Sequence, residues 1–194
     1  MTTVSIDQHR RRIRAPQDGE LVLRRPTDED GRRIHDLVAA CPPLDRNSMY
    51  CNLLQASHFA DTAIVAELDG ELVGCVTGYR LPEDPSVLFV WQVAVSEAGR
   101  GRGLAKRMLR GLLERFEGAV RHLHTTITPD NEASWALFRG LARDLGAETR
   151  HEVLFARDAH FGGAHDDEML LRIGPMPSDE DRVPLRRFAG GARR

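Results

Sequence analysis

A glycine-rich turn lies between a strongly apolar run and a helical pattern in the middle of the chain. Gly101 and Gly103 permit tight backbone conformations there, so backbone N–H groups can approach an anion. The helix predicted after the turn would add unpaired N–H groups and the positive end of its dipole. Together these features suit a pyrophosphate. The candidate cofactor contacts in this turn are Arg100, Gly101, Arg102, Gly103, Leu104 and Ala105.

Two other kinds of phosphate site are excluded by the residues around the turn. A P-loop needs a lysine followed by serine or threonine after the last glycine, and no such triplet occurs here. A dinucleotide-binding fingerprint needs another glycine three residues after Gly103, where the chain has Lys106. The turn therefore predicts a phosphate cradle of a different class.

Strand and helix patterns alternate on both sides of this turn. The apolar run 87–95 predicts a strand buried on both faces, and the spacing of apolar residues from Leu104 to Phe116 predicts an amphipathic helix. Asp69-Gly70 joins two β-branched runs and predicts a hairpin. Further strands are expected at 21–25, 62–68, 71–81, 120–128, 151–156 and 168–173, and further helices at 28–40, 47–57 and 131–145. This order predicts an α/β fold with a mixed central sheet flanked by helices.

Length and composition fit one domain with two polar ends. The chain has 194 residues, of which 41% are hydrophobic and 29% charged, and its formal net charge is -2. These values are ordinary for a globular protein and give no bias toward nucleic acid or a membrane. We expect a loosely ordered basic tail over 1–18, the domain over 19–175 and an arginine-rich tail over 176–194. No run of apolar residues is long enough to predict a membrane span.

The chain has three cysteines, Cys41, Cys51 and Cys75. An odd number without metal-type spacing predicts free thiols in a reducing cytoplasm. No spacing of histidine, cysteine and acidic residues predicts a metal site.

The turn and the helix pattern after the next strand resemble the GNAT family of acetyl-CoA-dependent N-acetyltransferases. The family signature Gln/Arg-x-x-Gly-x-Gly/Ala matches Arg100–Ala105, and Asn131–Phe138 is similar to the family's second cofactor motif. The resemblance implies the GNAT fold and acetyl-CoA as co-substrate. It also implies that Val93 and Val95 pair with the pantetheine arm and that Asn131 contributes to the cofactor site.

The same resemblance implies where the chemistry takes place. It places the thioester beside Trp91 and Gln92 on the central strand. Many members of the family have a tyrosine that protonates the departing thiolate, and this chain has Phe138 at that position. Because a thiol has a pKa of about 8.5, its thiolate can leave without full protonation. The phenylalanine at this position therefore argues against a general acid, but it does not argue against the acetyl transfer itself.

Five further segments resemble a narrower family, the L-2,4-diaminobutyrate acetyltransferases, over residues 19–175. They are Pro42–Tyr50, His58–Phe59, Leu88–Val95, Thr125–Asn131 and Arg172–Pro175. The resemblance implies acetylation of the 4-amino group of L-2,4-diaminobutyrate, giving N4-acetyl-L-2,4-diaminobutyrate. It further implies a role in the biosynthesis of the compatible solute ectoine under osmotic stress, and a homodimer.

Such an acceptor is a small dication with one carboxylate, so its pocket should carry anionic and aromatic side chains. The substrate-binding candidates are Asp45, Tyr50, Trp91 and Glu168, and the catalytic candidates are Trp91, Glu168 and His165. Each has a structural alternative. Asp45 could cap the helix that follows it, Tyr50 and Trp91 could belong to the core, and His165 could lie in an exposed acidic turn.

The residues leave the general base open. Residues 86–95 include no acidic side chain, so Glu168, His165 or a chain of waters could take the proton of the amine. We expect the neutral amine to attack the thioester directly, with backbone N–H groups near Gln92 and Val93 stabilising the oxyanion.

Two other functions stay open at this level. One is a GNAT enzyme for another amine, such as a drug, a polyamine or a protein N-terminus. The other is an acyl-CoA-binding regulatory module without turnover, which Phe138 permits. A nucleic-acid partner would rest on the arginine-rich tails alone, and neither nucleic acid nor a membrane is expected as a partner.

Overall fold

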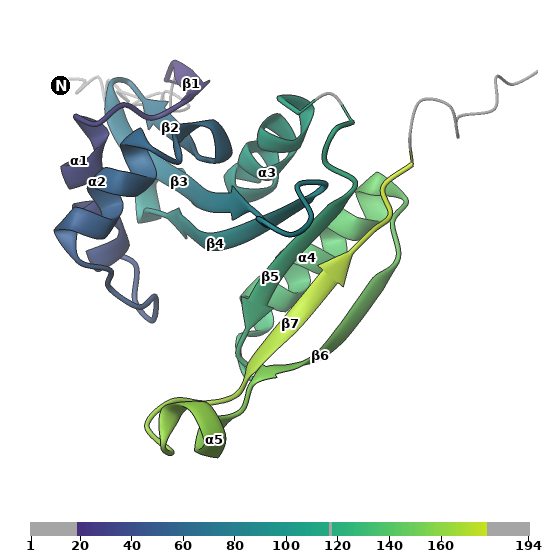
Figure 1. Cartoon of the computed structure of the whole chain (residues 1–194). Helices are drawn as coiled ribbons and strands as arrows, with labels where there is room; N and C mark the ends of the chain where they lie inside the picture. The colour runs from purple at the N-terminus through teal and green to yellow at the C-terminus, as the bar shows by residue number, and fades with distance from the viewer. Residues whose placement is uncertain (1–18, 117, 178–194) are drawn as a thin grey trace, which may run out of the picture.

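The computed structural model describes residues 19–116 and 118–177, which form a seven-stranded mixed sheet with helices on both faces (Figure 1). The strands follow the order β1-β2-β3-β4-β5-β7-β6, and β4 and β5 run parallel while the other neighbours are antiparallel. The elements are β1 (Leu21–Arg24), α1 (Asp30–Ala39), α2 (Met49–Ser57), β2 (Ile64–Leu68), β3 (Glu71–Arg80), β4 (Val87–Val95), α3 (Leu104–Glu114), β5 (His122–Ile127), α4 (Glu132–Leu145), β6 (Thr149–Phe155), α5 (Arg157–Phe161) and β7 (Glu168–Ile173). The predicted order of strands and helices is confirmed, with α5 as an addition.

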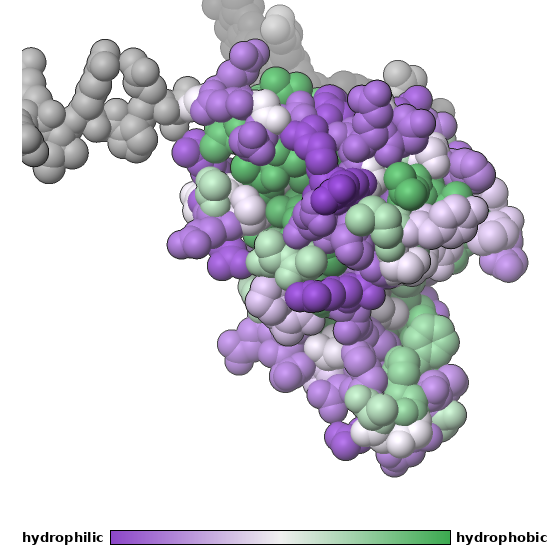
Figure 2. Space-filling model, turned by 90° about the vertical axis from the view of Figure 1, so that its left-hand side faces the viewer, coloured by the Kyte–Doolittle hydropathy of each residue, from purple (hydrophilic) through white to green (hydrophobic). Residues whose placement is uncertain are grey.

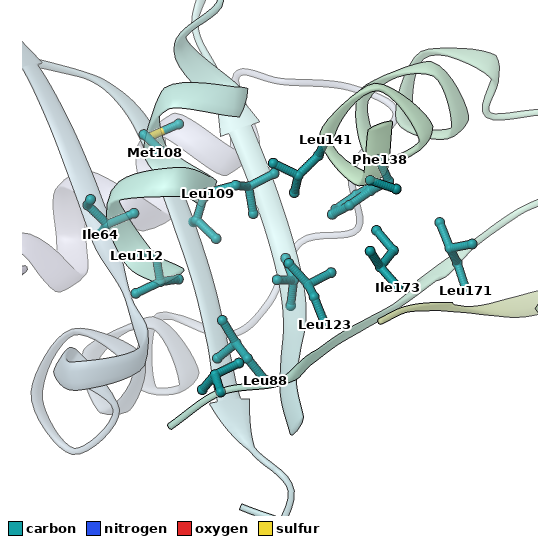
Figure 3. Packing of buried hydrophobic residues seen from close by; sticks show 14 of the residues in the cluster. Ile64, Leu88, Met108, Leu109, Leu112, Leu123, Phe138, Leu141, Leu171 and Ile173 are labelled. Atoms are coloured by element: carbon teal, nitrogen blue, oxygen red, sulfur yellow. The ribbon is translucent and has the colours of Figure 1, made fainter. Parts of the chain in front are cut away.

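Alternate residues of the strands face two separate apolar clusters. Ile64, Val76 and Leu88 belong to the larger cluster, which α3 and α4 cover, whereas Val65 and Cys75 face α1 and α2. Figure 3 shows the larger cluster, in which side chains of α3 and α4 point toward those of β4, β5 and β7. This alternation is what a sheet buried on both faces requires, and it explains why β4 is apolar at every position except Gln92.

Two local features of β4 shape the centre of the sheet. Its pairing with β5 ends at Val90 and Thr125, although both strands continue beyond that pair. The Thr125 hydroxyl donates to the Val90 carbonyl at 3.0 Å and closes the paired part. On the other side, Thr77 and Gly78 of β3 pair with Gln92 and Val90, so Trp91 is the extra residue of a β-bulge. Beyond this point β4 and β5 part.

Met176 extends the folded domain past the boundary expected at residue 175. Its side chain is 8% exposed within the larger cluster, and its N–H donates to the Arg121 carbonyl at 2.8 Å. The remainder of the two expected tails, residues 1–18 and 178–194, lies outside the described residues. No helix in the described ranges is long and apolar enough to cross a membrane.

A network of charged side chains fixes β1, α1 and β2 at one edge of the fold. Arg24 donates to both oxygens of Asp30 at 2.6 and 2.8 Å and to both oxygens of Glu67 at 3.0 and 2.8 Å. Arg33 joins both carboxylates at 3.1 and 2.7 Å. Hydrogen bonds from Arg24 hold the pKa of Asp30 and the pKa of Glu67 at about 2.

This network predicts a loss of stability in acid. Because both carboxyl groups have pKa values below the unfolded values of about 4, their stabilisation is fully present above about pH 4 and is lost as the pH falls toward 2. Asp30→Asn leaves two guanidinium groups with a weakened partner, so we expect it to lower the free energy of unfolding by about 2 kcal/mol at neutral pH. Denaturant unfolding at several pH values measures both effects.

The exposed Asp36 on the same helix provides the control. It lies 3.6 Å from Arg32 in a solvent-exposed pair, so Asp36→Asn should change the free energy of unfolding by less than about 0.5 kcal/mol. Equal losses from both variants would contradict the role assigned to the network.

Candidate active site

A cavity of about 850 Å³ opens where β4 and β5 part. Val90–Val93 of β4 form one wall, and Thr125–Thr128 at the end of β5 form another. The start of α4, the loop before α2 and the segment that leads into β7 complete the lining; the lining residues there are Asn131, Glu132, Ala133 and Ser134, then Pro43, Leu44, Asp45 and Asn47, and then His165, Asp166 and Glu168. Segments from five parts of the sequence therefore meet at the one place where the central sheet is open.

The glycine-rich turn leads into α3, and none of residues 100–105 is among those that line the cavity. Gly101 and Gly103 have φ angles of 74° and 64°, and Gly103 is the residue that immediately precedes α3. A Cβ atom added to either glycine would meet no protein atom within 4 Å. The turn is therefore open to an anion, and its backbone conformation is one that side-chain-bearing residues rarely adopt.

The other predicted cofactor contacts divide between the cavity and the apolar cluster. Val93 lines the cavity, whereas the side chain of Val95 packs against the larger apolar cluster. Leu104 is 2% exposed, so only its backbone is available to a cofactor. Asn131 lines the cavity and caps α4, its side-chain oxygen accepting from the Ser134 N–H at 3.0 Å. Since β4 is not paired with β5 beyond Val90, backbone groups on that side of β4 remain available to a ligand.

Trp91 owes its position to the bulge. Its side chain is 48% exposed, lines the cavity and lies edge-on to Tyr79 with ring centroids 6.4 Å apart. Tyr79 in turn stacks on Phe89 at 5.1 Å. The aromatic neighbours fix the indole at the mouth of the opening rather than in the core. Phe138 of α4 is 3% exposed and also lines the cavity.

His165 lies between two carboxylates on the acceptor side of the cavity. Its Nε2 is 3.6 Å from an oxygen of Asp45 and 3.8 Å from an oxygen of Glu168. Its Nδ1 is 2.8 Å from the backbone carbonyl of Asp166, which can only accept, so we assign the proton to Nδ1. The hydrogen bond to Asp166 and the charges of Glu168 and Asp45 raise the pKa of His165.

Two features of this side were not apparent from the sequence. Phe161 of α5 packs against the His165 ring at 4.8 Å between centroids, and α5 is too short to give a helical pattern. Gln92 lines the cavity and holds the loop before α2, although a glutamine within an apolar strand gave no signal of that contact.

The structure does not bring Tyr50 to the cavity. This side chain lies in the first turn of α2 and is 69% exposed, outside the residues that line the opening. Its assignment as a substrate-binding residue stays a prediction without geometric support in this structure. Asp45, Trp91, His165 and Glu168 do come together there. Within the described residues, no group of three or more histidine, cysteine or acidic side chains could hold a metal ion.

The fold and the cofactor turn define an acetyl-CoA-dependent acyltransferase. The family model of the GNAT acetyltransferases matches residues 32–142, and the chain belongs to this family. The family uses acetyl-CoA, and this chain is an acyltransferase of that kind.

Three comparisons narrow the relationship further. The chain is 53% identical over 157 residues to the L-2,4-diaminobutyric acid acetyltransferase of Methylotuvimicrobium alcaliphilum, which covers 80% of this chain and 91% of that protein. It is 51% identical over 158 residues to the enzyme of the same name from Vibrio cholerae, covering 81% and 91%. It is also similar to the structure of a diaminobutyrate acetyltransferase from Paenibacillus lautus in complex with L-2,4-diaminobutyric acid and coenzyme A. That match has a TM-score of 0.77 at 40% identity and covers 83% of this chain and 98% of the other.

The geometry of the turn predicts the effect of substituting Gly103. Gly103→Val places a β-branched side chain at a left-handed φ and in the open space of the cradle. We expect it to weaken acetyl-CoA binding by about tenfold or more. Isothermal titration calorimetry with acetyl-CoA measures this directly.

Gly118 offers a matched control. It has a φ of 82° and equally open surroundings, but it follows α3 and is remote from the cradle. Gly118→Val should therefore carry similar backbone strain and keep the wild-type affinity for acetyl-CoA. An unchanged affinity for acetyl-CoA in Gly103→Val would contradict the assignment of the cofactor's phosphates to this turn.

Proposed function

We propose that the protein transfers the acetyl group of acetyl-CoA to the 4-amino group of L-2,4-diaminobutyrate. The observation that carries the proposal is the placement of Asp45, His165 and Glu168 in the same cavity as Trp91. The names of the similar enzymes and the diaminobutyrate bound in one of them support the same acceptor.

The charge of the cavity suits this acceptor. Its lining includes five carboxylates and no arginine or lysine among the described residues; the carboxylates are Asp45, Asp130, Glu132, Asp166 and Glu168. Diaminobutyrate carries two ammonium groups at neutral pH, and desolvating them requires nearby negative charge. The indole of Trp91 adds a π-face for an ammonium group. A peptide N-terminus, with one ammonium group, would pair with one fewer of these carboxylates than diaminobutyrate does.

Different side chains bind the acceptor and accept the proton of its amine. Bound acetyl-CoA supplies the thioester carbon that a neutral amine attacks. Glu168 and Asp45 hold the substrate's ammonium groups, and the lone pair at Nε2 of His165 accepts the proton that the 4-amine must lose. The hydrogen bond from Nδ1 to Asp166 orients the ring for this role. Of the two acid–base candidates, we assign the base to His165 and charge pairing to Glu168.

The bulge in β4 provides the electrostatic side of the mechanism. Gln92 and Val93 lie where β4 still pairs with β3 but no longer with β5, so a backbone N–H of this segment that points away from β3 can donate to the negative charge developing on the acetyl oxygen. Phe138 takes the place of an acid, so the thiolate leaves unprotonated. No acyl-enzyme is needed, because burial raises the pKa of both Cys51 and Cys75 and so keeps those thiols protonated.

The setting of the reaction completes the proposal. The product, N4-acetyl-L-2,4-diaminobutyrate, would serve ectoine biosynthesis under osmotic stress, in the cytoplasm, where three free cysteines are stable. The proposal needs neither a nucleic acid nor a membrane as partner.

A homodimer is supported by the edge strand β6, where Val153, Leu154 and Phe155 are 48%, 36% and 43% exposed. Figure 2 shows apolar side chains gathered at the lower end of the molecule, at the height of α5, within a mostly hydrophilic surface.

Thiol release from acetyl-CoA with a panel of amines tests the function. The panel is diaminobutyrate, ornithine, lysine, spermidine and a peptide N-terminus, and mass spectrometry locates the acetyl group. We expect strong preference for diaminobutyrate with acetylation at N4. Turnover of another amine alone would contradict the acceptor but keep the chemistry. Acetyl-CoA binding without thiol release from any amine would instead favour a regulatory module.

The pH profile of turnover tests the base. Nε2 of His165 accepts a proton only when the ring is neutral, so the rate should rise as the pH increases through the raised pKa of His165. Asp45→Asn removes one of the charges that raise this pKa, so the acidic limb of kcat against pH should move to lower pH. Glu132→Gln removes a cavity carboxylate that is not among the groups acting on His165 and should leave the limb in place. An acidic limb that survives His165→Gln at its wild-type position would assign the base elsewhere.

A further inference from the structure

Gln92 ties the acceptor loop to the central strand. Its Nε2 donates to the backbone carbonyl of Asp45 at 2.7 Å, and its Oε1 accepts from the Asn47 side-chain amide, also at 2.7 Å. The Gln92 residue is 8% exposed, so both hydrogen bonds are largely shielded from water. A buried amide with both ends engaged is costly to disrupt, because removing either partner leaves a polar group without one.

The loop has few other constraints. Between α1 and α2, Leu44 donates to the Cys41 carbonyl at 3.1 Å, and Ser48 caps α2 by accepting from the Cys51 N–H at 3.1 Å. From Asp45 to Asn47, the hydrogen bonds of the described structure that join the loop to the sheet are the two made by Gln92. Gln92 therefore determines where the middle of this loop lies.

The position of the loop matters because of the side chain it carries. The Asp45 carboxylate is 83% exposed, and in the described structure it lies 3.6 Å from Nε2 of His165. Packing does not hold this side chain, so the position of its backbone decides how far the carboxylate can reach. Fixing the Asp45 carbonyl therefore limits the distance between this carboxylate and the pair formed by His165 and Glu168.

We infer that Gln92 is a positioning residue that sets the affinity for the acceptor by holding the Asp45 loop against β4. The inference rests on the proposed function, since it assigns Asp45 to the ammonium groups of the acceptor. Gln92 acts through Asp45, because its amide nitrogen and oxygen are both engaged with the loop. The neighbours Trp91 and Val93 line the opening on the thioester side, so one strand segment positions both substrates.

The variant Gln92→Met tests this role, because it keeps the length of the side chain and removes both hydrogen bonds. We expect the KM for diaminobutyrate to rise by about tenfold or more, with the affinity for acetyl-CoA within about twofold of wild type. Gln92→Glu is the second variant. It can still accept from Asn47 but cannot donate to the Asp45 carbonyl, so it should raise the KM as well.

Limited trypsin digestion provides a readout that does not depend on activity. Arg46 is an exposed residue in the middle of the loop, and mass spectrometry can quantify cleavage after it. Gln92→Met should be cleaved there faster than the wild-type protein, since the loop loses its tether.

Gln55→Met is the matched control. Gln55 lies on α2, is 2% exposed and accepts from Asn52 at 2.9 Å, a hydrogen bond within α2 and not to the loop. This control should keep both the wild-type KM and the wild-type cleavage at Arg46. If it raised both as Gln92→Met does, the effect would be a general loss of packing and the inference would fail.

Two further outcomes would overturn the inference. Wild-type KM and wild-type cleavage in Gln92→Met would show that the loop does not need the clamp. Faster cleavage with an unchanged KM would show that the order of the loop does not affect acceptor binding. Absence of diaminobutyrate turnover by the wild-type protein would contradict the proposed function instead, and cleavage at Arg46 would still decide whether Gln92 tethers the loop.

Discussion

The site depends on the point at which β4 and β5 cease to pair. Up to Val90 and Thr125 the two strands form a parallel ladder, buried between α3 and α4 on one face and α1 and α2 on part of the other. Beyond it, β4 carries backbone groups that β5 no longer satisfies, and a cavity opens. Unpaired backbone groups inside a fold need a partner. We propose that the amide groups along the extended arm of acetyl-CoA provide one, with its phosphates at the glycine turn before α3. The acceptor would then reach the thioester within this opening.

Charge decides what can use the acceptor face. The two carboxylates around His165 come from parts of the sequence far apart: Asp45 lies in the loop before α2, and Glu168 is the first residue of β7. Asp45 and His165 both lie in loops, so the site depends on tethers: the Gln92 amide for the first loop, and Phe161 packed against His165 for the second. The bulge at Trp91 lies next to the first of these tethers. It turns the indole into the opening, and the following residue is Gln92.

The sequence predicts the fold well where the signal is local. The run 87–95 corresponds to β4, and the Asp69-Gly70 turn has the positive φ angles of a tight hairpin, 53° and 84°. The glycine turn likewise has the left-handed angles that its composition predicts. By contrast, α5 is a single short turn without periodicity, and the boundary near Met176 depends on a contact with Arg121 across the fold.

Tyr50 and Gln92 show what the sequence could not predict about the site. Tyr50 was expected in the cavity and lies outside it, whereas Gln92 lines the cavity and was not expected to hold the loop. Whether a residue on α2 faces the cavity, or a glutamine in a strand reaches a loop 47 residues away, is set by tertiary packing, which spacing alone does not encode.

We propose that both substrates occupy the opening together and that the amine attacks the thioester directly. Initial rates measured with acetyl-CoA and diaminobutyrate varied against each other test this most directly. Intersecting double-reciprocal lines, with no acetyl group retained on the protein when the amine is omitted, are the predicted result. Parallel lines together with an acetylated protein would show that the acetyl group passes through the enzyme first, and would contradict the assignment of His165 as the base acting on the bound amine.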